Sequence, residues 1–172
     1  MDLRGYLKVL GAYVLIVLVQ VLIFNHIKIS PLSITPMFYV LFILIVPFEV
    51  PNWLQLFFAF VLGYTVDMFA DSPGLNTAAS VFMAFLRPMI LNMLAPRDGY
   101  ESGLYPYLTY MGMAWFIRYC IPLVVAHHLS YFLIDSIGFF HFSQVLIRIV
   151  ATSGVTVVFI ILSQFIAFRK RN

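Results

Sequence analysis

The fold is decided by the stretch WLQLFFAFVLGYTVDMFADSPG, residues 53–74 of the chain. It opens with an apolar run long enough for a membrane-spanning helix, carries Asp67 and Asp71 near its end, and closes with Ser-Pro-Gly. Because these last three residues favour turns, the chain reverses with almost no loop. The apolar run that follows, 75–94, therefore predicts a tight antiparallel helical hairpin.

Composition places the whole chain in lipid. Of its 172 residues, 63% are hydrophobic and 10% are charged, and the mean hydropathy is +0.99. Ordinary globular proteins have roughly 45–50% apolar and about 25% charged residues, so too few charges are present to solvate a water-soluble domain. A β-barrel would alternate apolar and polar residues, whereas residues 13–24 are apolar on nearly every face. We expect an all-α, polytopic membrane bundle.

Span lengths predict one integral-membrane domain over residues 1–172, with six transmembrane helices. The first resembles a signal peptide, but its apolar run is too long and lacks a small-x-small cleavage site, so we expect a retained signal anchor. The second is short between Pro36 and Pro47, and must continue through a kink or leave the bilayer thin. An interfacial stretch, 127–142, is expected after the fifth. The predicted spans are about 5–24, 36–50, 53–71, 75–94, 104–126 and 143–168.

The distribution of Lys and Arg predicts the orientation. With the N-terminus inside, the only basic residue of the outer loops is Lys28, and both termini are cytoplasmic. The basic pI of about 9.1 then reflects this asymmetry and contact with anionic lipid head groups, and we expect no nucleic-acid partner. The cytoplasmic basic residues are Arg4, Lys8, Arg97, Arg169, Lys170 and Arg171.

Charges inside spans are costly, so they are candidate functional groups. The predicted spans place Asp67, Arg118 and Arg148 in the outer half of the bilayer. Opposite charges at one depth relieve each other's desolvation, so we expect Asp67 to pair with Arg148 or Arg118, while Arg87 lies lower without an obvious partner. The group is either a structural staple or a polar site open to the outside.

No pattern predicts catalysis, a cofactor or a metal. Adjacent His127 and His128 point in different directions on a helix, and the H-E-x-x-H spacing is absent. Asp67 and Asp71 share a helix face, but the turn after Asp71 favours its solvation. The chain has no phosphate-binding loop and no G-x-S-x-G, and its single cysteine, Cys120, excludes an intramolecular disulfide. We expect a non-enzymatic protein.

The run FVLGYTVD, residues 60–67, with Pro-Gly-Leu at 73–75, resembles the G-x-x-x-D...G segment of the MreD family of rod shape-determining membrane proteins. The compact size agrees with that family, as do Asn25, Pro36, Tyr39, Pro47, Pro122 and the paired histidines. Matching the motif residue by residue assigns Gly63, Asp67 and Gly74 as site residues, and the depth argument adds Arg148 and His128.

The resemblance implies a non-catalytic scaffold of the bacterial cell-elongation and peptidoglycan-synthesis complex in the cytoplasmic (inner) membrane. Its partner would be a single-span MreC-like protein, and through it MreB, RodA and a class B penicillin-binding transpeptidase. The implied fold is similar to the substrate-binding S-component of vitamin transporters, six helices around an outward-facing cavity.

Two other functions remain open. A small-molecule binding subunit shares the expected fold and would need an outer pocket lined by Trp115, Tyr119 and polar groups. An intramembrane enzyme acting on a lipid would need Asp67, Asp71 and the histidines within about 3 Å of one another, or a metal.

Overall fold

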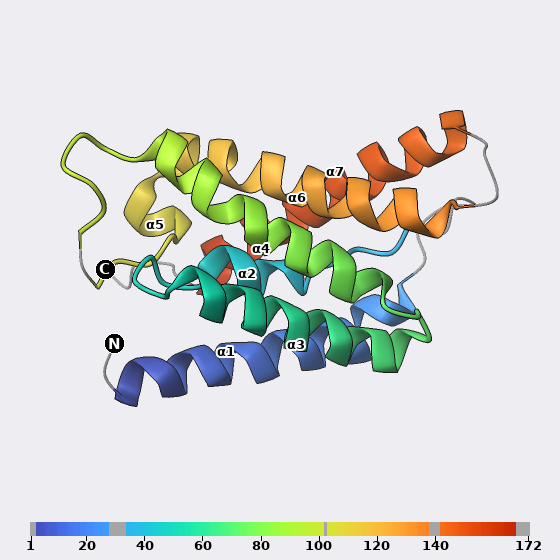
Figure 1. Ribbon diagram of the computed structural model, residues 1–172, viewed down its shortest axis with the longest axis horizontal. Helices are drawn as coiled ribbons and strands as arrows, with labels where there is room; N and C mark the ends of the chain where they lie inside the picture. Colours follow the sequence, from blue (N-terminus) through green and yellow to red (C-terminus); the bar gives the residue numbers. More distant parts are fainter. Residues whose placement is uncertain (1–2, 28–33, 102, 138–141, 168–172) are drawn as a thin grey trace.

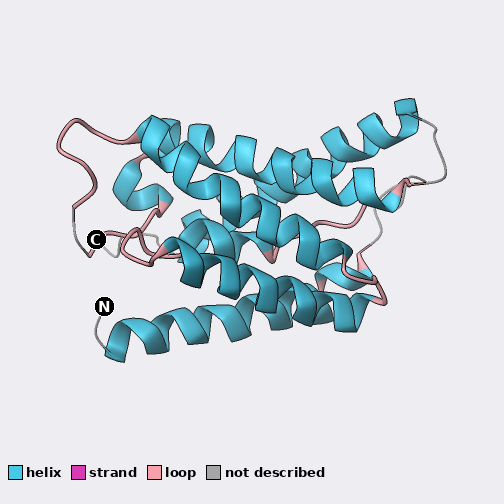
Figure 2. Cartoon of the chain, in the orientation of Figure 1, coloured by secondary structure: helices cyan, strands magenta, loops and turns pink. Residues whose placement is uncertain are grey.

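Helices make up the regular structure of the protein (Figures 1 and 2). The computed structural model describes residues 3–27, 34–101, 103–137 and 142–167, and no β-strand occurs in these ranges. Lys28, residues 138–141 of the predicted interfacial stretch and the basic residues 169–171 lie outside these ranges. The helices are α1 (Leu3–Leu22), η1 (Phe24–His26), α2 (Val40–Ile45), α3 (Asn52–Ala70), α4 (Leu75–Leu94), α5 (Leu108–Met111), α6 (Met113–Asp135) and α7 (Phe142–Ala167).

Five helical segments, in α1, α3, α4, α6 and α7, are long and apolar enough to cross a membrane. The outer surface is apolar, with large exposed side chains such as Leu15, Trp53, Phe85, Met93 and Ile166. Polar groups lie inside, among them Gln20, Gln55, Asp67, Asn76, Arg87, His127, His128, Thr156 and Gln164. This distribution suits a protein surrounded by lipid. The predicted all-helical, membrane-embedded fold class is confirmed at this level.

The second predicted span is not a membrane-length helix. Within 36–50 the structure has only α2, six residues long, so five membrane-length helices are described rather than six. Pro47 explains the early end, because it cannot donate an N–H to the preceding turn and forces Val46 into an extended conformation (φ −54°, ψ 131°). All six residues of α2 are buried. The non-helical residues on either side of α2, 36–39 and 46–47, are buried as well, so they are shielded from lipid, as non-helical chain at membrane depth requires.

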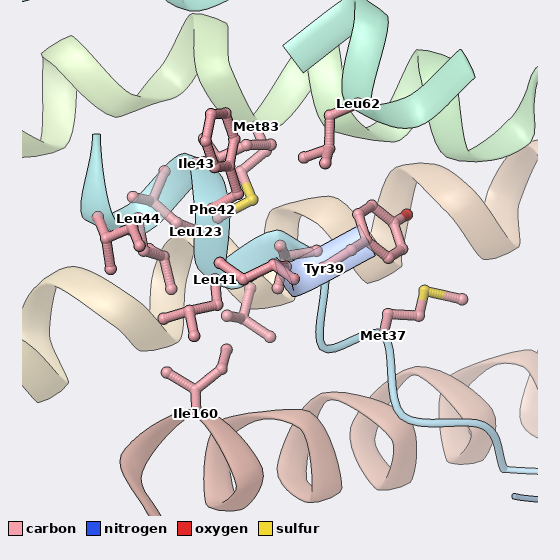
Figure 3. Close-up of a cluster of buried hydrophobic side chains, with 14 of the residues drawn as sticks. Met37, Tyr39, Leu41, Phe42, Ile43, Leu44, Leu62, Met83, Leu123 and Ile160 are labelled. Carbon is pink, nitrogen blue, oxygen red and sulfur yellow. The ribbon is translucent and has the colours of Figure 1, made fainter. Parts of the chain in front are cut away.

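The core is built around α2 (Figure 3). Leu41 and Leu44 from this helix belong to the same buried cluster as Leu62 of α3, Leu123 of α6 and Ile160 of α7. Helices α3, α4, α6 and α7 each contribute a fully buried side chain to the cluster around α2, and the one from α4 is Met83.

The long helices run in two directions. Helices α1, α3 and α6 begin at one end of the bundle, whereas α4 and α7 begin at the other (Figure 1). We name the first the basal end, and the second the turn end, because it holds the tight turn between α3 and α4. The segment 34–50 leads back toward the basal end, so α1 and α3 are parallel (Figure 1).

The boundaries predicted for the fifth span were wrong. Helix α6 begins after Gly112, whose φ of +82° separates it from α5, and continues to Asp135. Pro122 lies inside this helix without ending it. His127 and His128 are consequently fully buried in the bundle rather than in an interfacial stretch.

Candidate functional site

The carboxylate of Asp67 accepts five hydrogen bonds at the turn end. Its Oδ1 accepts from Ser72 Oγ (2.7 Å), Asn76 N (3.0 Å) and Asn76 Nδ2 (2.9 Å). Its Oδ2 accepts from Thr77 N (2.9 Å) and Thr77 Oγ1 (2.5 Å). A carboxylate with five donors around it has little capacity left for another partner.

Asp67 performs the capping role that the N-cap of α4 cannot. That N-cap is Gly74 (φ +82°), which has no side chain to accept from the first free N–H groups of the helix. Asp67 binds two of these, at Asn76 and Thr77, from the preceding helix. The turn also holds Asp71 in the left-handed region (φ 48°), exposed as predicted.

Gly63 lets α3 approach α4 closely enough for this contact. A Cβ atom there would lie 2.5 Å from Thr77 Cα and 2.6 Å from Asn76 O. Gly63, Asp67 and Gly74, the three motif residues, thus form one packed joint between α3 and α4. We name this unit the α3–α4 joint.

The predicted pairing of Asp67 with Arg148 or Arg118 was wrong. Arg148 lies at the turn end, but its Nη1 is 3.8 Å from Asp135 Oδ2, and its guanidinium lies 5.1 Å from the Phe132 ring centre. Arg118 is the sixth residue of α6, near the basal end and exposed, because that helix begins later than predicted. Nearby backbone and hydroxyl donors satisfy Asp67 instead of a distant cation.

The polar network extends from Asp67 into the bundle through Asn76. Tyr39 Oη donates to Asn76 Oδ1 (2.7 Å) and lies 2.8 Å from His127 Nε2. The directions are forced, because Asn76 turns its amide group to Asp67 and must accept from Tyr39. His127 Nε2 therefore carries the proton, and its buried Nδ1 has no hydrogen-bond partner among the described residues.

His128 belongs to a neighbouring branch. Its Nδ1 lies 2.8 Å from the Val124 carbonyl and so carries the proton, while Nε2 accepts from Thr156 Oγ1 (3.2 Å). Thr156 Oγ1 in turn accepts from Met37 N (3.1 Å). The two histidines, 5.3 Å apart between ring centres, thus fasten α6 to the buried chain before α2 and to α7. No group of three His, Cys, Asp or Glu side chains suited to a metal occurs in the described ranges.

A polar pocket of about 440 Å³ opens beside this network. Its wall includes Asn25, Tyr39, Asp71, Asn76 and Tyr131. It is not the pocket expected around Trp115 and Tyr119, which stack on each other beside Arg87.

A second polar centre surrounds Arg87, which is completely buried. Its Nε donates to Tyr119 Oη (2.7 Å), its Nη1 to Gln55 Oε1 (2.6 Å) and its Nη2 to the Val46 carbonyl. Tyr119 Oη donates onward to the Leu44 carbonyl (2.9 Å). This centre satisfies carbonyls at the end of α2 that have no helical donors. Sequence reasoning found no partner for Arg87, because none of its three acceptors is a carboxylate: two are uncharged side chains of other helices and one is a backbone carbonyl.

Replacing Asp67 by asparagine is expected to lower the free energy of unfolding by about 2 kcal/mol, since an amide cannot accept from all five donors. Thermal unfolding in mild detergent measures the effect. Asp71→Asn is the matched control, because Asp71 is exposed and lies four residues further on, in the turn directly after α3; this variant should leave the melting temperature nearly unchanged. Equal losses in both variants would contradict a capping role for Asp67.

Comparison with family models, with curated proteins and with solved structures gives no match to this chain. The fold and the polar centres define its class as a helical membrane-embedded protein. The polar groups around Asp67 and Arg87 are hydrogen-bonded inside the bundle, and the outer face is apolar.

Proposed function

We propose that this protein is a non-catalytic, MreD-like scaffold of the bacterial cell-elongation complex. It lies in the cytoplasmic membrane with both termini cytoplasmic and binds a single-span MreC-like protein. Through that partner it reaches MreB, RodA and a class B penicillin-binding transpeptidase. The segment 34–50 serves as a second, largely non-helical crossing, giving six crossings in an S-component-like arrangement.

The α3–α4 joint is the observation that carries this proposal. The resemblance to MreD rests on Gly63, Asp67 and Gly74, and these residues meet in one unit with a clear physical task. That task is structural, because the lone pairs of Asp67 are taken up by hydrogen bonds within the chain. An Asp67 held in this way suits a rigid scaffold better than a general base.

An apolar groove between α1 and α3 supports the binding of a partner helix. Its volume is about 320 Å³, and it lies on the membrane-facing side in the basal half of the bundle. Helix association in lipid depends on packing, so a lateral apolar groove suits the single transmembrane helix of an MreC-like protein. The groove is lined by Val9, Leu10, Tyr13, Phe42, Phe57, Phe58 and Val61.

Co-purification tests the proposal directly. The chain is co-expressed with the MreC-like protein of its source organism and extracted in mild detergent. We expect the two proteins to purify together and depletion of this chain to round rod-shaped cells. Val61→Trp should fill the groove and reduce recovery of the partner. Val158→Trp, an equal enlargement on exposed α7, should not. Absence of the complex together with normal cell shape would refute the scaffold function.

The second candidate is an S-component-like subunit that binds a small molecule, and the polar pocket at the turn end favours it. Thermal-shift screening of the purified protein with vitamin-like ligands separates the two functions. Stabilisation that is abolished by Asn25→Leu, in the pocket wall, would support the binding subunit.

A further inference from the structure

Arg118 is a charged side chain on the membrane-facing side of α6. It is exposed, and the residues that continue its face of the helix, Ile121, Val125 and Leu129, are exposed and apolar, with 43%, 39% and 39% of their surface accessible. A cation on a lipid-facing surface must find a polar partner or reach the head groups.

The protein provides that partner for its other arginines in the spans. Arg87 has three acceptors inside the bundle, and Arg148 has Asp135. In the described part of the chain, the guanidinium of Arg118 has neither a hydrogen bond nor an ion pair. Its neighbours three and four residues away on α6 are Ala114, Trp115, Ile121 and Pro122, none of them acidic.

The depth of Arg118 matches the head-group boundary at the basal end. Helix α6 has 23 residues and is about 35 Å long, slightly longer than a hydrocarbon core of about 30 Å. Arg118 lies five residues after Met113, about 7.5 Å along the axis, so its Cα is a few ångströms inside the boundary. An extended arginine side chain bridges that distance and places its guanidinium among the phosphates.

We propose that Arg118 binds the phosphate of an anionic phospholipid in the leaflet at the basal end. The planar guanidinium donates two parallel hydrogen bonds to phosphate oxygens, while the acyl chain covers the apolar face from Ile121 to Leu129. A lipid is favoured over an acidic partner helix because the charge lies at head-group depth. The contact is separate from the α1–α3 groove, so it does not depend on the scaffold function.

Native mass spectrometry and thermal unfolding of the purified full chain test this site. The probes are phosphatidylglycerol, phosphatidylcholine and inorganic phosphate, and the variants are Arg118→Gln, Arg118→Lys and the control Arg97→Gln, an exposed arginine in the loop after α4. Phosphatidylglycerol should stabilise the wild-type chain more than phosphatidylcholine does, and inorganic phosphate should have little effect. Arg118→Gln should bind phosphatidylglycerol about fivefold more weakly.

Arg118→Lys should retain part of the binding, because it keeps the charge without the planar fork, and Arg97→Gln should behave as wild type. Unchanged phosphatidylglycerol binding in Arg118→Gln would overturn the proposal. So would an equal loss in Arg97→Gln, which indicates diffuse attraction, or equal stabilisation by inorganic phosphate, which indicates a free-anion site. Loss of a co-purifying protein with unchanged lipid binding would make Arg118 a protein contact instead.

Discussion

Replacing Arg87 by leucine is expected to lower the free energy of unfolding by about 3–5 kcal/mol. The Val46 carbonyl and Gln55 Oε1 would lose their donors inside the bundle, and Tyr119 Oη would lose the hydrogen bond that it accepts. Each unsatisfied buried acceptor costs about 1–3 kcal/mol. No water reaches this position, since Arg87 has no exposed surface.

Thermal or denaturant unfolding in mild detergent measures this loss. Arg118→Leu is the matched control, an identical substitution at an exposed position of another spanning helix, and should change stability little in detergent without anionic lipid. Arg87→Lys should fall between wild type and Arg87→Leu, because an ammonium cannot reach three acceptors with the same fork geometry. A melting temperature of Arg87→Leu equal to that of the Arg118 control would show that the buried arginine does not stabilise the end of α2.

The α3–α4 hairpin could be predicted because its signals are local. Two apolar runs flank Ser-Pro-Gly, and the observed helices Asn52–Ala70 and Leu75–Leu94 differ little from the predicted spans. The side chains at the start of α4, residues 76–80, are short, so the two helices can pack closely there. The contact of Gly63 with the backbone of Thr77 now gives that packing a specific partner.

The second and fifth spans were harder because their limits depend on tertiary context. Hydropathy could not show that α2 stops after six residues. The early end leaves the carbonyls of Leu44 and Val46 without helical donors, and these carbonyls accept hydrogen bonds from Tyr119 and Arg87, which lie on helices distant in sequence. Hydropathy also did not show that Gly112 separates α5 from α6. That shift moved His127 into the core and Arg118 to the basal end.

The charge pairing failed for a related reason. The positions of Asp67 and Arg148 along their predicted spans correctly placed both residues at the same end of the bundle. A shared depth in the membrane does not determine which side chains pair, however. Asp67 has uncapped N–H groups nine and ten residues further along the chain, at Asn76 and Thr77, and closing this short loop costs less chain entropy than binding an arginine on α7. Arg148 binds Asp135, the last residue of α6, which hydropathy had left outside every span.

Replacing Gly63 by alanine is expected to destabilise the protein by about 2–4 kcal/mol, although alanine is the better helix former by about 1 kcal/mol. The added methyl group would meet backbone atoms of α4, at 2.5 Å from Thr77 Cα and 2.7 Å from Thr77 N, which cannot rotate away. Helices α3 and α4 must then separate. Asp67, one turn further along α3, would lose its short contacts with Asn76 and Thr77.

Gly154→Ala in α7 is the matched control, because no atom lies within 4 Å of a Cβ built there. The stability of this variant should be unchanged or higher by up to about 1 kcal/mol. The same glycine-to-alanine substitution is therefore expected to destabilise the protein in α3 but not in α7. A double variant tests whether separation of the joint is the cause. Gly63→Ala combined with Asp67→Asn should then lose less stability than the sum of the two single losses. The reason is that Gly63→Ala already removes the contacts of Asp67 that Asp67→Asn would weaken. Strict additivity, or equal stability of the Gly63 and Gly154 variants, would contradict a close-packed α3–α4 joint.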